Sequence, residues 1–250
     1  MVGTGNTRYT VQCHRARGML AKPCDGSRRF LPCLPLHAHA DTVPIVRVAI
    51  RGRVSMRVVA GELRSRRLHT VAGRETRPTS DRARAGLFDW LGPSHVGGAR
   101  VLDLYAGTGA LGIEALSRGA REAIFVERAR GALRVLRQNL EELELSDRAR
   151  VVEADLERGL RALRAKLGSF DLVLADPPYE SGARAKLLAD DALASMLEPD
   201  AVVVVERSAR DQAGENSVHL RLCGSKRYGE TAFDWWESTA DAAAANEALA

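Results

Sequence analysis

The sequence contains no apolar run close to the roughly 20 residues that a membrane-spanning helix needs. Its first 30 residues also lack the apolar stretch that a secretory signal carries. These two absences argue against a membrane protein and against a secreted one. We therefore expect a cytoplasmic protein with no membrane partner.

Closely paired cysteines are missing as well. The sequence has four cysteines, Cys13, Cys24, Cys33 and Cys223, and none belongs to a CxxC pair. Zinc sites usually use tight cysteine or histidine pairs, so this spacing argues against a zinc site. We expect reduced thiols and no metal.

What is present is a composition close to that of globular proteins. Hydrophobic residues make up 45% and charged residues 28% of the 250 positions. This length suffices for one α/β domain with a packed core and some additional segments.

Positive charge is unevenly distributed. Residues 1–55 hold nine basic residues against two acidic ones, a net charge of +7 that leaves −2 for the rest of the chain. Residues 1–55 show no amphipathic period, so we expect a poorly ordered extension and folded sequence from Met56 onward. A transit peptide, a nucleic-acid-binding arm and a start-site artefact are the alternatives for this extension.

Residues 56–98 predict a basic β-hairpin followed by a helix. MRVVAGELRSRRLHTV contains two β-prone runs on either side of Gly61. Thr79 or Ser80 is suited to cap a helix over SDRARAGLFDWL, which Gly92-Pro93 ends.

From residue 99 to 238 the pattern predicts a catalytic core in which strands and helices alternate. The apolar runs VLDLY, AIFV, LVLA and VVVV are continuous, which is typical of a parallel sheet covered by helices on both faces. SVHLRLC and FDWW follow without a helix between them and predict a closing antiparallel pair, before an alanine-rich tail at 239–250. We predict strands at 100–105, 122–127, 149–153, 170–175 and 201–206, and helices near 110–118, 129–143, 156–166 and 184–196.

The loop after the first predicted core strand admits two interpretations. DLYAGTGALG contains Gly107, Gly109 and Gly112 in a GxGxxG pattern, and Glu127 lies 20 residues after Gly107. This is the dinucleotide fingerprint as written, and an NAD-dependent oxidoreductase is one reading of it. However, Asp103 near the end of the strand would repel a diphosphate.

S-adenosyl-L-methionine fits the same loop better, because it carries an ammonium and a sulfonium and no phosphate. Asp103 is then expected near the amino-acid end of the cofactor, Glu127 on the ribose hydroxyls and Asp155 on the adenine amine. Tyr105, Gly107 and Gly109 are expected to line the same pocket. Taken singly, each of these acids could equally cap a helix, most of all Asp155.

LVLADPPYE predicts a fourth strand that ends in a clamp for an amine. The lone pair of a nucleobase amine is delocalised into the ring, so a catalyst must accept hydrogen bonds from its N–H groups. Asp176 offers a carboxylate, and Pro177 offers a carbonyl that the tandem proline Pro178 helps to aim. Tyr179 is suited to stack on the base. An ordinary turn is the alternative for this stretch.

Four stretches together resemble one family: MRVVAGELRSRRL, TRPTSDRARAGLFDWL, VLDLYAGTGALGIEALSRGA and VLADPPY. Residues 56–237 are similar to the bacterial 16S ribosomal RNA guanine-N2 methyltransferases. Of the four stretches, the one that leads into the LFDWL helix is the most specific to this family. The resemblance implies a Rossmann-like class I methyltransferase with a seven-stranded, mostly parallel sheet. It further implies S-adenosyl-L-methionine as donor, a guanine in 16S ribosomal RNA as acceptor, and action on a small-subunit assembly intermediate. Arg77 and Thr79 are implied to line the cofactor pocket.

The arginines of residues 57–84 predict a track for RNA phosphates. We expect Arg64, Arg66 and Arg67 to contact RNA, although a solvated basic surface explains some of this cluster, and Arg82 and Arg84 could merely decorate the helix. Lys226 and Tyr228, in KRYGET, either reach the substrate or belong to an ordinary hairpin turn. We expect the tryptophans to pack rather than to stack on bases, and the protein to be a monomer.

Two other functions remain open at this point. An N6-adenine methyltransferase acting on DNA or RNA would use the same amine clamp. A non-catalytic RNA-binding assembly factor would keep the fold but would have no need of an intact DPPY.

Overall fold

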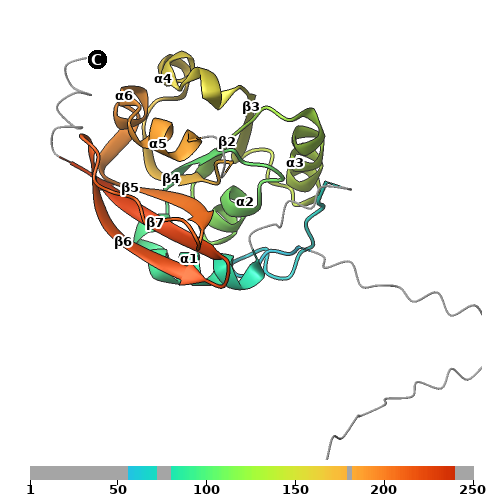
Figure 1. Cartoon of the computed structure of the whole chain (residues 1–250). Helices are drawn as coiled ribbons and strands as arrows, with labels where there is room; N and C mark the ends of the chain where they lie inside the picture. The colour runs from blue at the N-terminus through green and yellow to red at the C-terminus, as the bar shows by residue number, and fades with distance from the viewer. Residues whose placement is uncertain (1–55, 72–79, 179–181, 240–250) are drawn as a thin grey trace, which may run out of the picture. The chain divides into compact units, whose positions relative to one another are not determined.

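The computed structural model describes residues 56–71, 80–178 and 182–239. The predicted extension 1–55 and the tail 240–250 lie outside these ranges. The described part of the chain forms a seven-stranded sheet in the order β3-β2-β1-β4-β5-β7-β6 (Figure 1). The strands are β1 (Arg100–Leu104), β2 (Glu122–Glu127), β3 (Ala149–Glu153), β4 (Phe170–Ala175), β5 (Leu197–Ser208), β6 (Leu220–Tyr228) and β7 (Thr231–Ser238).

Strands β1 to β5 are parallel, and β7 and β6 close the sheet as an antiparallel pair. The predicted parallel sheet and its antiparallel end are therefore confirmed. The order reverses between β1 and β4, because β2 and β3 lie on one side of β1 and the later strands lie on the other. In open α/β sheets, ligands bind outside the carboxyl ends of the strands at such a switch point.

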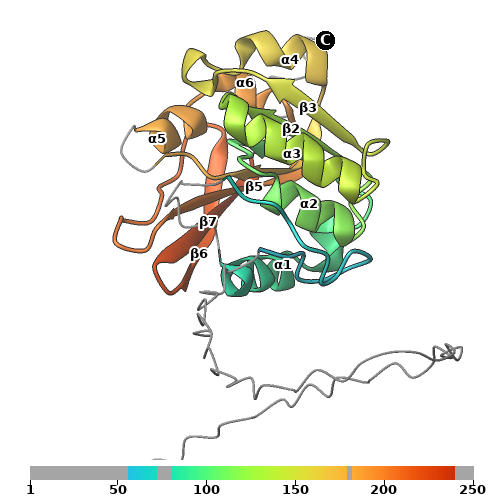
Figure 2. The same ribbon diagram turned by 90° about the vertical axis from the view of Figure 1, so that its right-hand side faces the viewer.

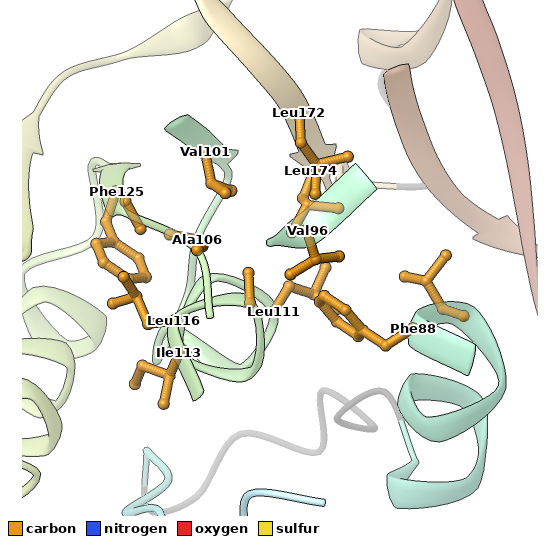
Figure 3. Close-up of a cluster of buried hydrophobic side chains, with 14 of the residues drawn as sticks. Phe88, Val96, Val101, Ala106, Leu111, Ile113, Leu116, Phe125, Leu172 and Leu174 are labelled. Carbon is orange, nitrogen blue, oxygen red and sulfur yellow. The ribbon is translucent and has the colours of Figure 1, made fainter. Parts of the chain in front are cut away.

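Helices cover both faces of the sheet, as Figures 1 and 2 show. One hydrophobic cluster joins Val101, Leu172, Leu174, Val202 and Val204 to the helices α1 (Asp81–Val96), α2 (Ala110–Ser117) and α3 (Arg130–Glu142). Figure 3 shows part of this cluster, with Leu116 of α2 beside Phe125 of β2 and Leu111 of α2 on the side of Phe88.

The second cluster takes the alternate residues of the same strands, because successive side chains of a strand point to opposite faces. It packs Leu102, Leu104, Val173, Val203 and Val205 against the shorter helices on the other face. These helices are α4 (Arg161–Leu167), α5 (Ala183–Leu188) and α6 (Asp191–Ala194).

Two helices predicted as continuous are interrupted, and those predictions were wrong. The stretch 156–166 forms the 3-10 turn η1 (Leu156–Arg158) and then α4, with Gly159 at φ 87° between them. The stretch 184–196 forms α5 and α6. Asp190 stabilises both breaks, because its carboxylate accepts from Ala192 N of α6 at 2.9 Å and from Leu160 N at 3.2 Å.

The predicted hairpin forms a compact loop with minimal pairing. Arg57 and Arg67 make a single antiparallel bridge, and Val58 N donates to the Arg66 carbonyl at 2.9 Å. The loop is bound to α2 instead. Glu114 accepts from Val59 N and Ala60 N at 2.8 and 3.0 Å, so the loop is held on the core by side chains rather than by strand pairing.

Helix α1 begins at the predicted cap, since the Ser80 hydroxyl accepts from Ala83 N at 3.1 Å. The helix bends at Gly92, which has φ 62°, and a last turn follows Pro93. The ring centres of Trp90 on this helix and Trp235 on β7 lie 3.9 Å apart, so these tryptophans pack as predicted. No helix within the described ranges is long and apolar enough to span a bilayer.

Candidate active site

The carboxyl ends of the parallel strands bring most of the predicted site residues to one edge of the sheet. Asp103 comes from β1, Glu127 from β2, Asp155 follows β3 and Asp176 follows β4. The prediction that these acids share an edge is therefore confirmed by the topology. Arg77, Thr79 and Tyr179 lie outside the described residues.

The glycine loop turns sharply from β1 into α2. Tyr105 and Gly107 both have φ 57°, and Gly109 has φ 86°. A side chain at Gly109 would be strained by this φ and would also place its Cβ 2.4 Å from Leu136 Cδ1 of α3. Glycine at this position therefore lets the loop lie against α3.

Asp103 binds the first turn of α2, directly after this loop. Its side chain is 1% exposed, and its Oδ2 accepts from Gly112 N at 2.9 Å. Burial raises the pKa of Asp103 to about 7, against the opposing effect of the Gly112 hydrogen bond, and the nearby Glu127 charge raises it further. Direct contact of Asp103 with a ligand stays a prediction, because its carboxylate lies beneath the loop.

Glu127 is held in position by backbone amides. Its Oε2 accepts from Gly107 N at 2.8 Å, and its Oε1 accepts from Arg128 N at 2.8 Å and Ala129 N at 2.7 Å. A carboxylate has about four lone-pair positions, so these bonds fix its orientation and leave it capacity for a ligand hydroxyl.

Asp155 takes the helix-cap role that the sequence left open, and its contact with the adenine amine stays a prediction. It caps η1 by accepting from Glu157 N at 3.1 Å, and it also accepts from Arg128 Nη1 at 3.1 Å. Arg128, which follows Glu127 and was not predicted, thus links the ends of β2 and β3 above the loop. No pattern around Arg128 distinguishes it from the many other arginines of the chain.

A cavity of about 150 Å³ lies next to this acidic edge. Its lining includes Tyr105, Leu156, Leu160, Lys186 and Asp190. Tyr105 comes from the glycine loop and Leu156 follows Asp155, so the cavity adjoins the expected cofactor residues. Its other lining residues come from η1 and the turn after it and from α5 and the residues after that helix, and no motif marked them.

Asp176 stands at the end of β4, where its N–H donates to the Leu104 carbonyl at 3.3 Å. Asp176 is exposed at the edge of the sheet, yet protein atoms crowd its carboxyl group. This desolvation, followed by the charges of Glu206 and Asp103, raises the pKa of Asp176 well above its ordinary value. Such accumulated negative charge favours a cationic ligand.

Glu206 is the acid of this edge that the sequence analysis missed. It lies near the end of β5, is 2% exposed and follows the run VVVV, just as Asp103 and Glu127 come late in their own apolar runs. That shared pattern was the available signal. A cavity of about 190 Å³ beside it is lined by Pro177, Pro178, Arg184, Glu206, Arg207 and Asp211, among others.

Strand register extends this edge toward the predicted RNA-binding residues. Glu206 pairs with Phe233 of β7, and Phe233 pairs with Lys226 of β6. Paired residues point to the same face of a sheet, so Lys226 lies in one row with Glu206. Lys226 is exposed, with its Nζ 5.6 Å from the centre of the Tyr228 ring.

Tyr228 packs against the core, so its prediction as an RNA contact was wrong. Its hydroxyl is buried, and its ring occupies the space that a side chain at Gly86 of α1 would fill, 2.1 Å from an added Cβ. The ring also lies 6.2 Å from that of Phe233. Tyr228 therefore joins the sheet to α1.

The predicted basic surface is retained on the loop and, on the helix, by Arg82 but not by Arg84. Arg64, Arg66 and Arg67 are exposed, and Arg66 donates to the Glu142 carbonyl at 2.7 Å. Arg84 was expected on the helix surface, which was wrong. It is fully buried and donates to the Arg57 carbonyl at 2.6 Å and to Asp81 Oδ1 at 2.8 Å.

The described ranges hold no group of three or more His, Cys, Asp or Glu side chains placed to bind a metal ion. The edge instead offers carboxylates, a sharply turned glycine loop and two cavities. These features fit S-adenosyl-L-methionine, whose ammonium, sulfonium and ribose hydroxyls are complementary to carboxylates, better than they fit a diphosphate.

Comparison with known proteins agrees with this geometry. The family described as "Conserved hypothetical protein 95" matches residues 56–237. A Bacillus subtilis relative named "Putative rRNA methyltransferase YlbH" is 40% identical over 176 residues, which cover 70% of this chain and 95% of the relative. The Escherichia coli protein named "Ribosomal RNA small subunit methyltransferase D" is 33% identical over 192 residues, 76% of this chain and 93% of that protein.

The solved structure titled "Putative methyltransferase yhhF from Escherichia coli" shares the architecture. It superposes with a TM-score of 0.63 at 32% identity and covers 74% of this chain and 99% of that one. The chain therefore belongs to the conserved hypothetical protein 95 family, and its fold is that of the S-adenosyl-L-methionine-dependent class I methyltransferases.

Proposed function

We propose that this protein methylates the exocyclic N2 amine of a guanine in small-subunit ribosomal RNA. The observation that carries the proposal is the position of Asp176 and Pro177. They follow β4 directly, beside the end of β1 that leads into the glycine loop, so the amine clamp and the cofactor loop share one edge of the sheet. The relatives named as ribosomal RNA methyltransferases support RNA as the substrate.

The chain's own groups explain how an unreactive amine is activated. The Asp176 carboxylate accepts one N–H of the amine and the Pro177 carbonyl accepts the other. These two bonds draw the nitrogen toward a tetrahedral geometry and free its lone pair. As the nitrogen acquires positive charge, the carboxylates of Asp176 and Glu206 stabilise it. No covalent enzyme intermediate is needed.

S-adenosyl-L-methionine supplies an electrophilic methyl group when it is bound. In this proposal, Glu127 holds the ribose hydroxyls and Gly107 and Gly109 allow close approach of the backbone. Asp103 stabilises the turn from the loop into α2 through its hydrogen bond from Gly112 N. Asp155 and Arg128 lie beside the adenine. Tyr179 is proposed to stack on the target base, and Arg77 and Thr79 to complete the cofactor pocket.

The exposed arginines of the loop 56–68 are proposed to bind RNA phosphates, together with Lys226 of β6. Arg64, Arg66 and Arg67 supply charge without sequence information, whereas the clamp acts on the base. We propose that the protein works as a cytoplasmic monomer on an assembly intermediate of the small subunit.

Nucleoside mass spectrometry of 16S ribosomal RNA tests the proposal. RNA from cells that lack the gene should lose one N2-methylguanosine, and expression of the wild-type gene should restore it. A strain in which N2-methylguanosine is unchanged, or in which N6-methyladenosine is lost instead, would contradict the proposal and favour the adenine methyltransferase. A strain with no change in any modified nucleoside would favour a non-catalytic assembly factor.

A further inference from the structure

Glu206 has a position that the amine clamp alone does not explain. It lies on β5, whose register with β4 pairs Val205 with Ala175, so the next positions of the two strands are Glu206 and Asp176. Neighbouring strands are about 4.8 Å apart, which places two carboxylates within reach of one small ligand.

The two side chains also point to the same face of the sheet. Leu174 and Val204, two positions before Asp176 and Glu206, both face the cluster beneath α1 and α2. Side chains alternate along a strand, so Asp176 and Glu206 follow them onto that face. Glu206 also lines the cavity of about 190 Å³ that includes Pro177. A single water needs roughly 10–15 Å³, so this cavity is far larger than a water site.

We propose that Glu206 accepts a hydrogen bond from N1–H of the target guanine and thereby selects guanine against adenine. This inference rests on the proposed function and adds a specificity-determining residue to it. On the Watson–Crick edge of guanine, N1–H and the N2 amine are adjacent donors. Two neighbouring carboxylates match them, with Glu206 on N1–H and Asp176 on the amine.

Adenine cannot make this pair of contacts. Its N1 carries a lone pair in place of a hydrogen, and that lone pair would face the Glu206 carboxylate. A site built to hydrogen-bond a substrate N–H rejects an analogue that lacks it, and here the lone pair of adenine N1 and the carboxylate would also repel each other. Bases outside a helix are read in this way, through their Watson–Crick edge.

The next residue along the strand holds Glu206 in place. Arg207 is 7% exposed and donates to Asp234 Oδ2 at 2.8 Å and to Ser225 Oγ at 2.9 Å. It also donates to the Asp211 carbonyl at 2.8 Å. These bonds join β5 to β6, β7 and the segment after β5, so the backbone that carries Glu206 is fixed on several sides.

An experiment with 2-aminopurine tests the inference. This base keeps the 2-amine of guanine but has a lone pair at N1. The substrate is a small-subunit particle reconstituted with 16S RNA ligated from two fragments, so that the target position is guanine or 2-aminopurine. We compare kcat/KM on both particles for the wild type, Glu206→Gln and the control Glu237→Gln. Glu237 lies on β7, pairs with Val202 in the middle of β5 and forms a surface ion pair with Arg221.

The wild type and Glu237→Gln should prefer guanine by about 10- to 100-fold, the range expected for a hydrogen bond to a charged group. Glu206→Gln should lose most of this preference, because its amide can donate to N1 of 2-aminopurine. If Glu206→Gln lost kcat/KM equally on the guanine and the 2-aminopurine particles, the inference would be overturned. Equal use of both particles by the wild type would also overturn it, even if Glu206→Gln does not fold. A wild type inactive on guanine would instead refute the proposed function.

Discussion

The side-chain amide of Asn139 donates to the carbonyl of Thr108 at 3.0 Å and so attaches helix α3 to the glycine loop. The same side chain also binds the backbone of His69, accepting from its N–H at 2.8 Å and donating to its carbonyl at 3.2 Å. Asn139 is 1% exposed. It therefore joins the cofactor loop to the chain that leaves the basic loop.

Replacing Asn139 with Ala should destabilise the protein and weaken cofactor binding. The change removes three partly buried hydrogen bonds, each worth about 0.5–1.5 kcal/mol, so we expect a loss of about 2–4 kcal/mol in the free energy of unfolding. Urea unfolding and calorimetric titration with S-adenosylhomocysteine measure the two effects. Gln138→Ala, on the exposed side of α3, is the matched control. Unchanged affinity in folded Asn139→Ala would show that the link does not support the loop.

Asp176→Ala should abolish methyl transfer while leaving cofactor binding nearly unchanged. The substitution removes the acceptor for the amine but leaves Asp103, Glu127 and the glycine loop intact. Single-turnover assays with labelled cofactor measure transfer, and thermal shift with S-adenosylhomocysteine measures binding. Substantial residual transfer would show that the carboxylate is not needed to activate the amine.

The pH dependence of methyl transfer should report the raised pKa of Asp176. Its carboxylate must be ionised to accept the N–H of the amine and to stabilise the positive charge on the nitrogen, so kcat/KM should rise with pH through a pKa well above that of an ordinary aspartate. Glu206 is one cause of the raised pKa. Glu206→Gln should therefore move the acid limb of the profile to lower pH, whatever its effect on the rate. A limb that stays at the same pH in this variant would contradict the coupling between the two carboxylates.

Replacing Arg64, Arg66 and Arg67 together with Ala should weaken RNA binding and flatten its salt dependence. Each phosphate contact contributes roughly 0.7–0.9 to the slope of log K against log salt concentration, so three lost contacts lower the slope by about 2. Filter binding from low to high salt measures this slope. The control triple is Arg150, Arg161 and Lys166, which are exposed on β3 and α4. If both triples lower the slope equally, the effect is one of net charge and not of a phosphate track.

Asp103→Asn should remove a pH dependence of stability. The pKa of Asp103 is about 7 in the folded protein against an ordinary value of 3.8, so the folded state binds its proton more tightly than the unfolded state. Its contribution to stability is thus present at low pH and is lost as pH rises from about 4 to about 7. That difference corresponds to about 4 kcal/mol. Urea unfolding at pH 5 and pH 8 should show a smaller decrease for Asp103→Asn, and an identical decrease would contradict the raised pKa.

The local pattern was sufficient to predict the order of strands and helices in the core. Continuous apolar runs identified the buried parallel strands, because such strands are apolar on both faces. The acids near the ends of those runs then had to meet at one edge, since the carboxyl ends of parallel strands lie together. Asp103, Glu127, Asp155 and Asp176 all meet this expectation.

Other features depended on contacts between residues far apart in the sequence. The break before α6 needs Asp190, whose carboxylate also binds Leu160 N from another segment. Arg84 is buried because a carbonyl from the loop 56–68 receives its guanidinium, and Tyr228 packs because Gly86 leaves it room.

By itself, the sequence determined which residue types stand at the edge of the sheet, because apolar period and turn residues are local properties. The tertiary structure decided which of them act together. Glu206 becomes the neighbour of Asp176 only through the register of β5 on β4, and register is set by the packing of both faces of the sheet.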